Sequence, residues 1–176
     1  QPLNNEDGTL VLITNGEIYN YIELRKQLEQ KGHTFSTKSD SETILHLYEE
    51  YGSLCVHYLR GMFAFALWDT KNKRLMLARD RMGEKPLYYF ETKDKLIFSS
   101  ELKSILQSQE IPFQLDPDAI NLYFYYQYVP EPRTPIKNIK KLPPGHFLII
   151  DLIPFKCSQI CYWEMENAEP LADNPA

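Results

Sequence analysis

Residues 62–67 read Met-Phe-Ala-Phe-Ala-Leu, six consecutive apolar residues with no polar residue among them. A strand with one face in water alternates apolar and polar residues, whereas a strand that is covered on both faces does not. This stretch therefore predicts a strand in the middle of a layered molecule, with one layer packed on each of its faces.

Further strands are expected on both sides of this stretch, because short apolar segments alternate with polar turn segments along the chain. The expected strands cover residues 9–14, 74–78, 86–90, 95–99 and 147–150. The turns between residues 62 and 99 are short, which favours an antiparallel meander. The first of these strands is expected to stop at Asn15-Gly16.

Two helices are expected between the first strand and residue 62. The first follows Asn20, which fits a capping box with Glu23, and it ends at Gly32. The second follows the start signal at residues 39–42 and ends at Gly52. The order at the start of the chain is therefore strand, turn and two helices.

Two further helices are expected in the second half of the chain, at residues 101–106 and after Asp116. There, Asp116 is suited to cap the helix and Pro117 to occupy its first position. Antiparallel strands together with separate helices predict an α+β protein.

Composition excludes several classes of function. The chain has 176 residues and a formal net charge of −5, the wrong sign for a protein that mainly binds nucleic acid or an anionic membrane. It has no apolar run near the ~20 residues that cross a bilayer, and no signal peptide at its start. Three cysteines cannot all pair with one another, which favours the reducing cytoplasm. One domain is expected.

Several common motifs are missing from the sequence. The seven glycines form neither a G-x-G fingerprint nor a P-loop, and there is no G-x-S-x-G elbow. The four histidines form no H-E-x-x-H motif, and Cys55-Val56-His57 is too small a group for a zinc site. We therefore expect no metal and no cofactor in this chain.

Asn15-Gly16 is the first candidate site, and two interpretations are open. Asn-Gly is a common tight turn, since both residues tolerate a positive φ. Here, however, an expected helix follows and not a returning strand. An Asn side-chain amide and a Gly N–H are also two neutral donors that together can stabilise an oxyanion.

Glu17 and Asp40 are two acidic candidates for the same site. Alone, Glu17 is a solvated side chain, and Asp40 is an N-cap or first-turn acid of the second helix. If the fold brings them together, the two carboxylates are suited to hold a cationic group such as an α-ammonium. The sequence does not establish whether they meet.

The aromatic residues Tyr123–Tyr126 and Tyr128 are a further conspicuous group. Stacking on nucleic-acid bases normally comes with neighbouring Lys or Arg, and none lies beside them. We expect these side chains to pack in the core or at an interface.

Five segments of the sequence carry a family resemblance. They are Asn15–Asn20 (NGEIYN), Gly61–Asp69 (GMFAFALWD), Arg79–Tyr89 (RDRMGEKPLYY), Ser99–Lys103 (SSELK) and Leu142–His146 (LPPGH). Together they resemble the glutaminase domain of glutamine-hydrolysing asparagine synthetases, occur in the order of that family and span nearly all of residues 1–165. The Asn-Gly element alone is shared with other class II glutamine amidotransferases.

The resemblance implies a fold and a set of site residues. The fold is an N-terminal-nucleophile (Ntn) hydrolase, a four-layer αββα sandwich of antiparallel sheets, here truncated at the N-terminus. Asn15 and Gly16 would form the oxyanion hole, and Glu17 and Asp40 would bind the amino group of glutamine. In this family the nucleophile is an N-terminal cysteine, whose own α-amine has a pKa low enough to carry the proton at neutral pH.

The resemblance also divides the chain. Residues 1–165 match part of a type 2 glutamine amidotransferase domain, and residues 166–176 match the linker toward a synthetase domain. The cysteine segment would precede Gln1, and Cys55, Cys157 and Cys161 do not match its nucleophile. The ATP- and Mg-dependent synthetase domain would follow. We expect the segment alone to be inactive.

The implied function is the glutaminase part of a cytoplasmic enzyme that makes asparagine from aspartate, ATP and L-glutamine. The expected partners are glutamine and the synthetase domain of the same polypeptide; a homodimer stays open. Two alternatives remain: a non-catalytic binding module with this fold, and a related amidotransferase with another carboxylate acceptor.

Overall fold

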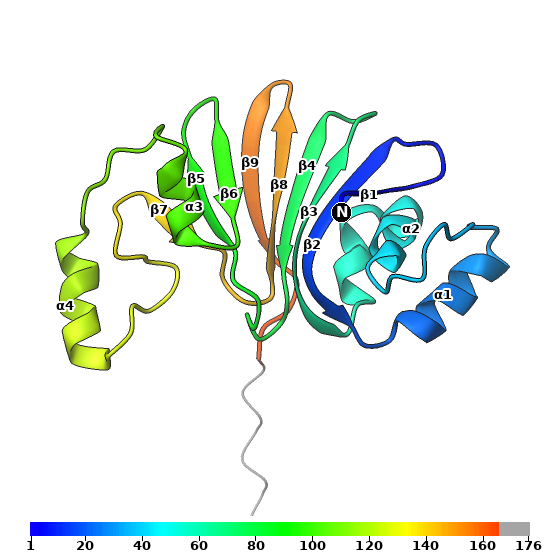
Figure 1. Ribbon diagram of the computed structural model, residues 1–176, viewed down its shortest axis with the longest axis horizontal. Coiled ribbons are helices and arrows are strands. Elements are labelled where there is room, and N and C mark those ends of the chain that lie inside the picture. Colours follow the sequence, from blue (N-terminus) through cyan, green and yellow to red (C-terminus); the bar gives the residue numbers. More distant parts are fainter. Residues whose placement is uncertain (166–176) are drawn as a thin grey trace, which may run out of the picture.

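The computed structural model describes residues 1–165 and contains two antiparallel sheets (Figure 1). The large sheet has the strand order β1–β2–β3–β4–β8–β9, and the small sheet has the order β6–β5–β7. The strands are β1 (Leu3–Asn4), β2 (Leu10–Ile18), β3 (Gly61–Asp69), β4 (Arg74–Arg79), β5 (Tyr88–Glu91), β6 (Leu96–Ser99), β7 (Ile139–Lys141), β8 (His146–Leu152) and β9 (Phe155–Cys161).

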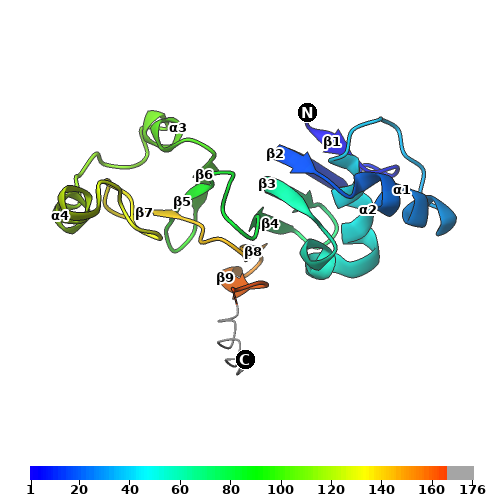
Figure 2. The same cartoon turned by 90° about the horizontal axis from the view of Figure 1, so that it is seen from below.

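The helices lie on the outer sides of the two sheets, and α4 stands apart from both of them, as the two perpendicular views show (Figures 1 and 2). Helices α1 and α2 flank the large sheet, while α3 and α4 lie on the side of the small sheet. The four helices are α1 (Tyr21–Gln30), α2 (Glu42–Tyr51), α3 (Leu102–Gln107) and α4 (Pro117–Tyr126), and a 3₁₀ helix covers Gly52–His57. The α+β class and the order helix–sheet–sheet–helix are confirmed.

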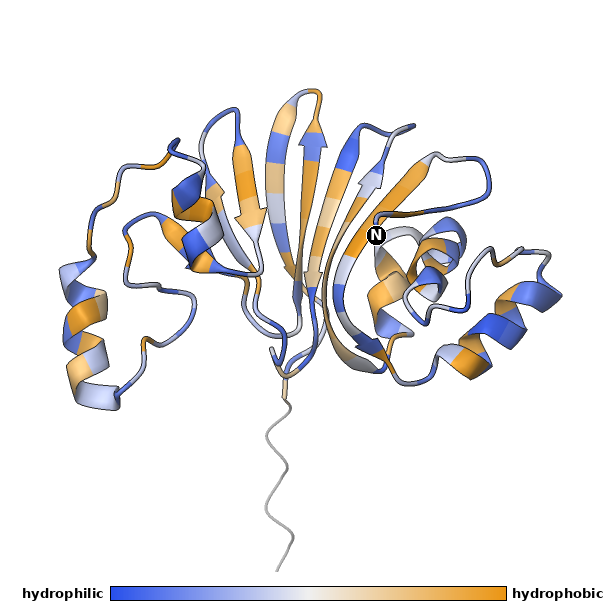
Figure 3. Ribbon diagram, viewed as in Figure 1, coloured by the Kyte–Doolittle hydropathy of each residue, from blue (hydrophilic) through white to orange (hydrophobic). Residues whose placement is uncertain are grey.

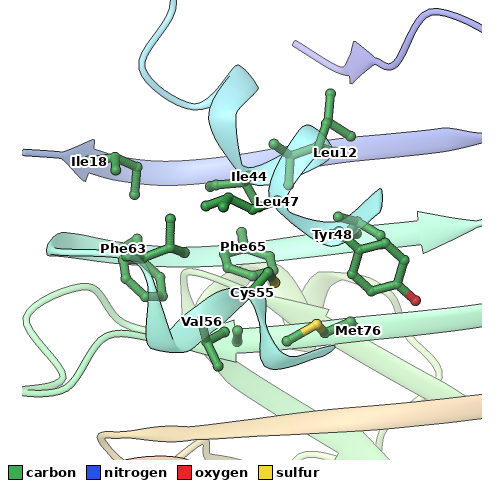
Figure 4. Packing of buried hydrophobic residues seen from close by; sticks show 14 of the residues in the cluster. Leu12, Ile18, Ile44, Leu47, Tyr48, Cys55, Val56, Phe63, Phe65 and Met76 are labelled. Carbon is green, nitrogen blue, oxygen red and sulfur yellow. The ribbon is translucent and has the colours of Figure 1, made fainter. Parts of the chain in front are cut away.

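Strand β3 is buried on both faces, as its apolar sequence predicts. On one face, Phe63 and Phe65 pack with Ile44 and Leu47 of α2 (Figure 4). On the other face, Ala64 and Ala66 contact the side chains that lie between the two sheets, and Figure 3 shows the apolar residues running along both sheets.

The predicted meander is wrong in one respect, since β4 and β5 belong to different sheets. Strand β4 pairs with β8, which comes about seventy residues later in the chain, and β5 pairs with β6 and β7. Strand β9 was not expected at all. It is an edge strand whose sequence mixes polar and apolar residues, so it carries no clear apolar pattern.

The first strand continues four residues beyond its expected end. Asn15, Gly16 and Glu17 lie inside β2 and pair with Ala64, Phe63 and Met62 of β3. The turn interpretation of Asn-Gly is therefore wrong. Pairing with β3 overrides the local turn preference, because a long partner strand satisfies the backbone groups of these residues.

The capping box expected at Asn20 is also absent, although α1 begins where predicted. The Asn20 side chain makes no cap bond; its Nδ2 donates to the carbonyl oxygen of Tyr58 at 2.9 Å, and its Oδ1 accepts from the N–H of Arg60 at 2.9 Å. The Asn20 side chain thus connects the end of β2 to the segment before β3 through two hydrogen bonds. The Asp116 cap of α4 is confirmed, since its carboxylate accepts from the N–H groups of Asp118 and Ala119.

No helix among residues 1–165 has the length and apolar character needed to cross a membrane. The segment 166–176, which was expected to be a linker, lies outside the described residues.

Candidate functional site

The outer edge of β2 is held by side chains at two positions. The Thr14 N–H donates to Oε1 of Gln1 at 2.8 Å, and the Ile18 N–H donates to Oδ2 of Asp40 at 2.6 Å. In an antiparallel strand, alternate N–H groups point to the same edge, so the Gly16 N–H also points away from β3. Residues 1–165 provide no acceptor for it there. Gly16 therefore presents a free donor between two occupied ones.

Glycine is required at this position by the close approach of the next strand. A Cβ on Gly16, whose φ is +151°, would overlap the carbonyl oxygen of Met62 and lie 2.6 Å from Cα of Phe63. The partner strand β3 also requires a glycine where it approaches β2, because a Cβ on Gly61 would overlap the carbonyl oxygen of Glu17. Two glycines on facing strands thus set the backbone position of residue 16.

Asn15 faces the opposite way from the core of the large sheet. It shares a face with its partner Ala64 and lines an open pocket of about 320 Å³ between the two sheets. The pocket gives a small molecule access to the Asn15 side chain. Its other lining residues are Gln1, Ile13, Thr14, Ala64, Phe65, Ala66, Leu87, Phe98, Ser99 and Ser100.

A hydrogen bond between distant segments places the Asp40 carboxylate at the end of β2. Asp40 binds the N–H of Ile18, the residue directly after Glu17, although 22 residues separate the two in sequence. The carboxylate of Asp40 is therefore no helix cap; α2 begins two residues later, and it is the backbone oxygen of Asp40 that accepts from the Thr43 N–H.

Three carboxylates, those of Glu17, Asp80 and Glu84, lie near Tyr19 at this end of β2. The pKa of Tyr19 is raised by desolvation and then by the charges of Glu84, Glu17 and Asp80. Glu17 is exposed, so its carboxylate is open to a ligand.

Asp80, which the sequence analysis did not single out, supports the site through hydrogen bonds to the backbone of β3 and of the loop that follows β4. Its buried carboxylate accepts from the N–H of Phe63, the β3 residue that lies opposite Gly16, and from three N–H groups of the loop that follows, those of Met82, Glu84 and Lys85. One carboxylate thus fixes both β3 and the loop that carries Glu84.

Arg79 also binds backbone groups of the same loop, but its guanidinium group donates to carbonyl oxygens. It is buried, donates to the carbonyl oxygens of Gly83, Lys85 and Leu142, and pairs with Glu131 at 2.8 Å. The signal in the sequence was an Arg-Asp pair at the end of an apolar strand. Its role depends on carbonyl groups up to 63 residues away, so only the fold reveals it.

The three cysteines are poorly placed to be nucleophiles for this site. Cys55 is fully buried, and burial raises its pKa to about 12; desolvation and Glu91 raise the pKa of Cys157 to about 12. Cys161 is on β9, four strands from β2, which at about 4.8 Å per strand is roughly 19 Å away. That none of them matches the family's nucleophile stays a prediction.

Comparison with solved structures bears on the fold. The fold matches the glutamine phosphoribosylpyrophosphate amidotransferase of B. subtilis with a TM-score of 0.62 at 23% identity, over 90% of this chain and 31% of that one. At this identity the likeness establishes the fold, which is that of the Ntn-hydrolase amidotransferases.

Sequence comparison then identifies the family. The chain belongs to the glutamine amidotransferase domain family, whose model matches residues 1–163. It is 48% identical over 145 residues to asparagine synthetase [glutamine-hydrolyzing] 1 of Bacillus subtilis (strain 168), and 40% identical over 172 residues to asparagine synthetase 2 of the same organism. These matches cover 82% and 95% of this chain but 23% of each relative. The chain thus spans about a quarter of the length of these relatives.

Proposed function

We propose that this chain is the glutaminase part of a larger glutamine-dependent asparagine synthetase. It would hydrolyse L-glutamine to glutamate and ammonia, and the ammonia would amidate aspartate. The observation that carries the proposal is the free Gly16 N–H on the edge of β2, beside Asn15 and next to two carboxylates. The similarity to asparagine synthetases supports the same assignment.

Attack of a thiolate on the amide carbon of glutamine places a negative charge on the carbonyl oxygen. The Gly16 N–H and the Asn15 side-chain amide are neutral donors that would stabilise this oxyanion. One such donor typically contributes about 10²- to 10³-fold to the rate, because its dipole is already oriented before the charge develops. The close contact between Gly16 and β3 provides that fixed orientation.

Glu17 and Asp40 would hold the α-ammonium group of glutamine. Asp40 uses Oδ2 to bind the Ile18 N–H, while its Oδ1 has two long contacts of 3.4 Å, from the hydroxyls of Ser39 and Ser41. Oδ1 therefore keeps capacity for a charge-assisted hydrogen bond from an ammonium group. Glu17 would supply the second negative charge.

The remaining parts of the reaction would come from elsewhere in the whole protein. We infer that the nucleophile is the N-terminal cysteine of a segment preceding Gln1, with its α-amine as the proton carrier. A synthetase domain of the same polypeptide would bind ATP and Mg and activate aspartate. Residues 1–176 alone would then be inactive, and the intact enzyme would work in the cytoplasm.

The test uses the full-length protein and the variant Asn15→Ala. Glutamine hydrolysis, measured as glutamate release, should fall by about 10²-fold or more, since one oxyanion donor is lost. Asparagine formation from aspartate, ATP and added ammonia should be unchanged, because that reaction bypasses the glutaminase. Asn4→Ala is the matched control: Asn4 is an exposed asparagine on the neighbouring strand β1.

Unchanged glutamate release in Asn15→Ala would refute the oxyanion role. If the wild-type protein releases no glutamate at all, the non-catalytic alternative holds. If glutamate is released but no asparagine forms with aspartate as the sole acceptor, the protein amidates another carboxylate.

A further inference from the structure

Four metal-ligating side chains meet beside α2. They are Glu6, which lies in the β1–β2 connection, His33 just after α1, and His46 and Glu49 on α2. Each offers one ligand atom, and the four atoms all lie within 4.8 Å of one another. Three separate segments of the chain therefore converge on one point.

Three of the six distances between these atoms are close to those around a tetrahedral metal ion. Bonds of 2.0–2.1 Å from a zinc ion to nitrogen or oxygen place the ligand atoms about 3.4 Å apart. In the structure, Oε2 of Glu49 lies 3.0 Å from Nδ1 of His46 and 3.3 Å from Nδ1 of His33, and Nδ1 of His46 lies 3.6 Å from Oε2 of Glu6. These separations bracket the expected value.

Both carboxylates are oriented by a neighbour that binds their other oxygen. Nδ2 of Asn5 donates to Oε1 of Glu49 at 2.8 Å, and the Thr34 N–H donates to Oε1 of Glu6 at 2.9 Å. In each case Oε2 is the atom left facing the cluster. Such outer partners are typical of metal sites, where they fix the direction of the ligand.

Each imidazole also has one ring nitrogen that faces the cluster and a second one that faces an outer carboxylate. Nε2 of His33 lies 3.1 Å from Oε1 of Glu50, so its Nδ1 faces the cluster. His46 is completely buried, and its Nδ1 faces the cluster. Its Nε2 has no hydrogen-bond partner within the described chain, and Oε1 of Glu42 lies 3.9 Å from it. A metal on Nδ1 of His46 would keep the proton on Nε2, directed toward that carboxylate.

We propose that Glu6, His33, His46 and Glu49 bind one Zn²⁺ ion. Two neutral imidazoles and two carboxylates carry a total charge of −2, which matches a divalent cation, and a mixed nitrogen and oxygen set suits zinc. Four protein ligands leave no open position, so the ion would be structural and not catalytic. The proposal departs from the expectation of no metal, which considered contiguous motifs only, and is independent of the proposed glutaminase function.

The ion would connect three segments whose positions matter for the candidate site. His33 stands at the start of the loop that ends at Asp40, and Glu6 belongs to the connection that leads into β2. Binding would therefore fix the approach of both segments to α2. Removing the ion would loosen that loop without touching Asn15 or Gly16.

The test measures zinc binding to the full-length protein after treatment with a chelator. Zinc chloride is titrated in competition with a chromophoric chelator, for the wild type and for His33→Gln and Glu49→Gln, two partly exposed ligand positions. Each variant should lose one zinc per chain. Glu50→Gln should keep that zinc but bind it about 10- to 100-fold more weakly, since outer partners contribute that much. His57→Gln, an exposed histidine outside the cluster, is the control and should bind as the wild type does.

A second measurement does not depend on the folding of the variants. The thermal midpoint of the wild type should rise on adding zinc, and cobalt in its place should give the strong visible absorption of a four-coordinate site. The proposal is overturned if the wild type takes up no zinc that His33→Gln and Glu49→Gln lack, or if its thermal midpoint does not respond. The cluster would then be a network of histidine–glutamate ion pairs.

Discussion

Helices α2 and α4 are each ten residues long, yet α2 is largely buried and α4 is largely exposed. In α2, seven consecutive residues, Glu42–Tyr48, are buried. In α4 only Ala119 is buried, and Phe124 and Tyr125 are each 79% exposed. The difference runs against composition, because α4 holds seven apolar or aromatic residues and α2 holds five. Burial depends on what surrounds a helix and not on its apolar content.

The surroundings explain the contrast. Helix α2 packs on the covered face of the large sheet, next to α1 and the 3₁₀ helix (Figures 1 and 4). Helix α4 stands at the far end of the molecule, beside the small sheet (Figure 2). The expectation that its aromatic residues pack in a core is therefore wrong for residues 1–165, and packing at an interface stays a prediction. The candidate site lies on the side of the molecule with the larger core.

The largest effect is expected from the core beneath α2. Ile44→Ala should lower the free energy of unfolding by about 2–5 kcal/mol, because a fully buried side chain is lost and a cavity remains. Chemical denaturation followed by circular dichroism measures the change. Ile22→Ala, at a 65% exposed position of α1, is the control and should change stability little. Similar effects in both variants would show that α2 is not the centre of the core.

A smaller effect is expected at the buried start of α2. The Glu42 carboxylate accepts from the N–H and hydroxyl groups of both Ser36 and Thr37, and it is 1% exposed. Glu42→Gln replaces one acceptor oxygen by an NH₂ donor, which should cost about 1–3 kcal/mol. The same denaturation experiment measures it. A change below the error of that experiment would show that the loop at residues 36–37 is held by other contacts.

The contribution of Glu42 should also depend on pH. Burial opposes its ionisation, but the hydrogen bonds from Thr37 and Ser36 outweigh burial and lower its pKa below the ordinary value. A carboxyl whose pKa is lowered on folding stabilises the protein at neutral pH, and this contribution is lost as the pH falls through the folded-state pKa. The stability difference between wild type and Glu42→Gln should therefore shrink between pH 6 and about pH 3. A difference that stays constant would contradict the assignment.

At the start of α4, the expected effect is that of a local cap. Asp116 accepts from two N–H groups of its own helix, so Asp116→Ala should lower the free energy of unfolding by about 1 kcal/mol. Asp116→Asn is the control, since asparagine caps about as well. Hydrogen exchange of the Asp118 and Ala119 amides shows whether the loss is local. A cost as large as that of Ile44→Ala would mean that α4 is tied to the core more tightly than its exposure suggests.

The smallest effect is expected on the exposed face of α4. Phe124→Ser should change the stability of the segment by no more than about 0.5 kcal/mol, because the side chain is already in contact with solvent. Denaturation of residues 1–176 and of the full-length protein gives the comparison. A clear loss in the full-length protein alone would show that another part of that protein covers α4.

Patterns of a few neighbouring residues were sufficient for much of the fold. The unbroken apolar run at residues 62–67 predicted a strand buried on both faces, and Asp116-Pro117 predicted a capped helix; both are confirmed. Such features depend on backbone and side-chain preferences within one element, which the sequence states directly. The choice of Asn15, Gly16, Glu17 and Asp40 came from the chemistry of their side chains and backbone together with motif order, and their roles stay predictions.

What the tertiary structure alone decided involves groups that are far apart in sequence. Pairing with β3 turned Asn15-Gly16 from a turn into a strand, and Asp40 reached Ile18 instead of capping its own helix. The cluster that contains Glu6 and His46 forms across forty residues. Local preferences are worth about 1 kcal/mol, so long-range pairing and burial override them wherever the two conflict.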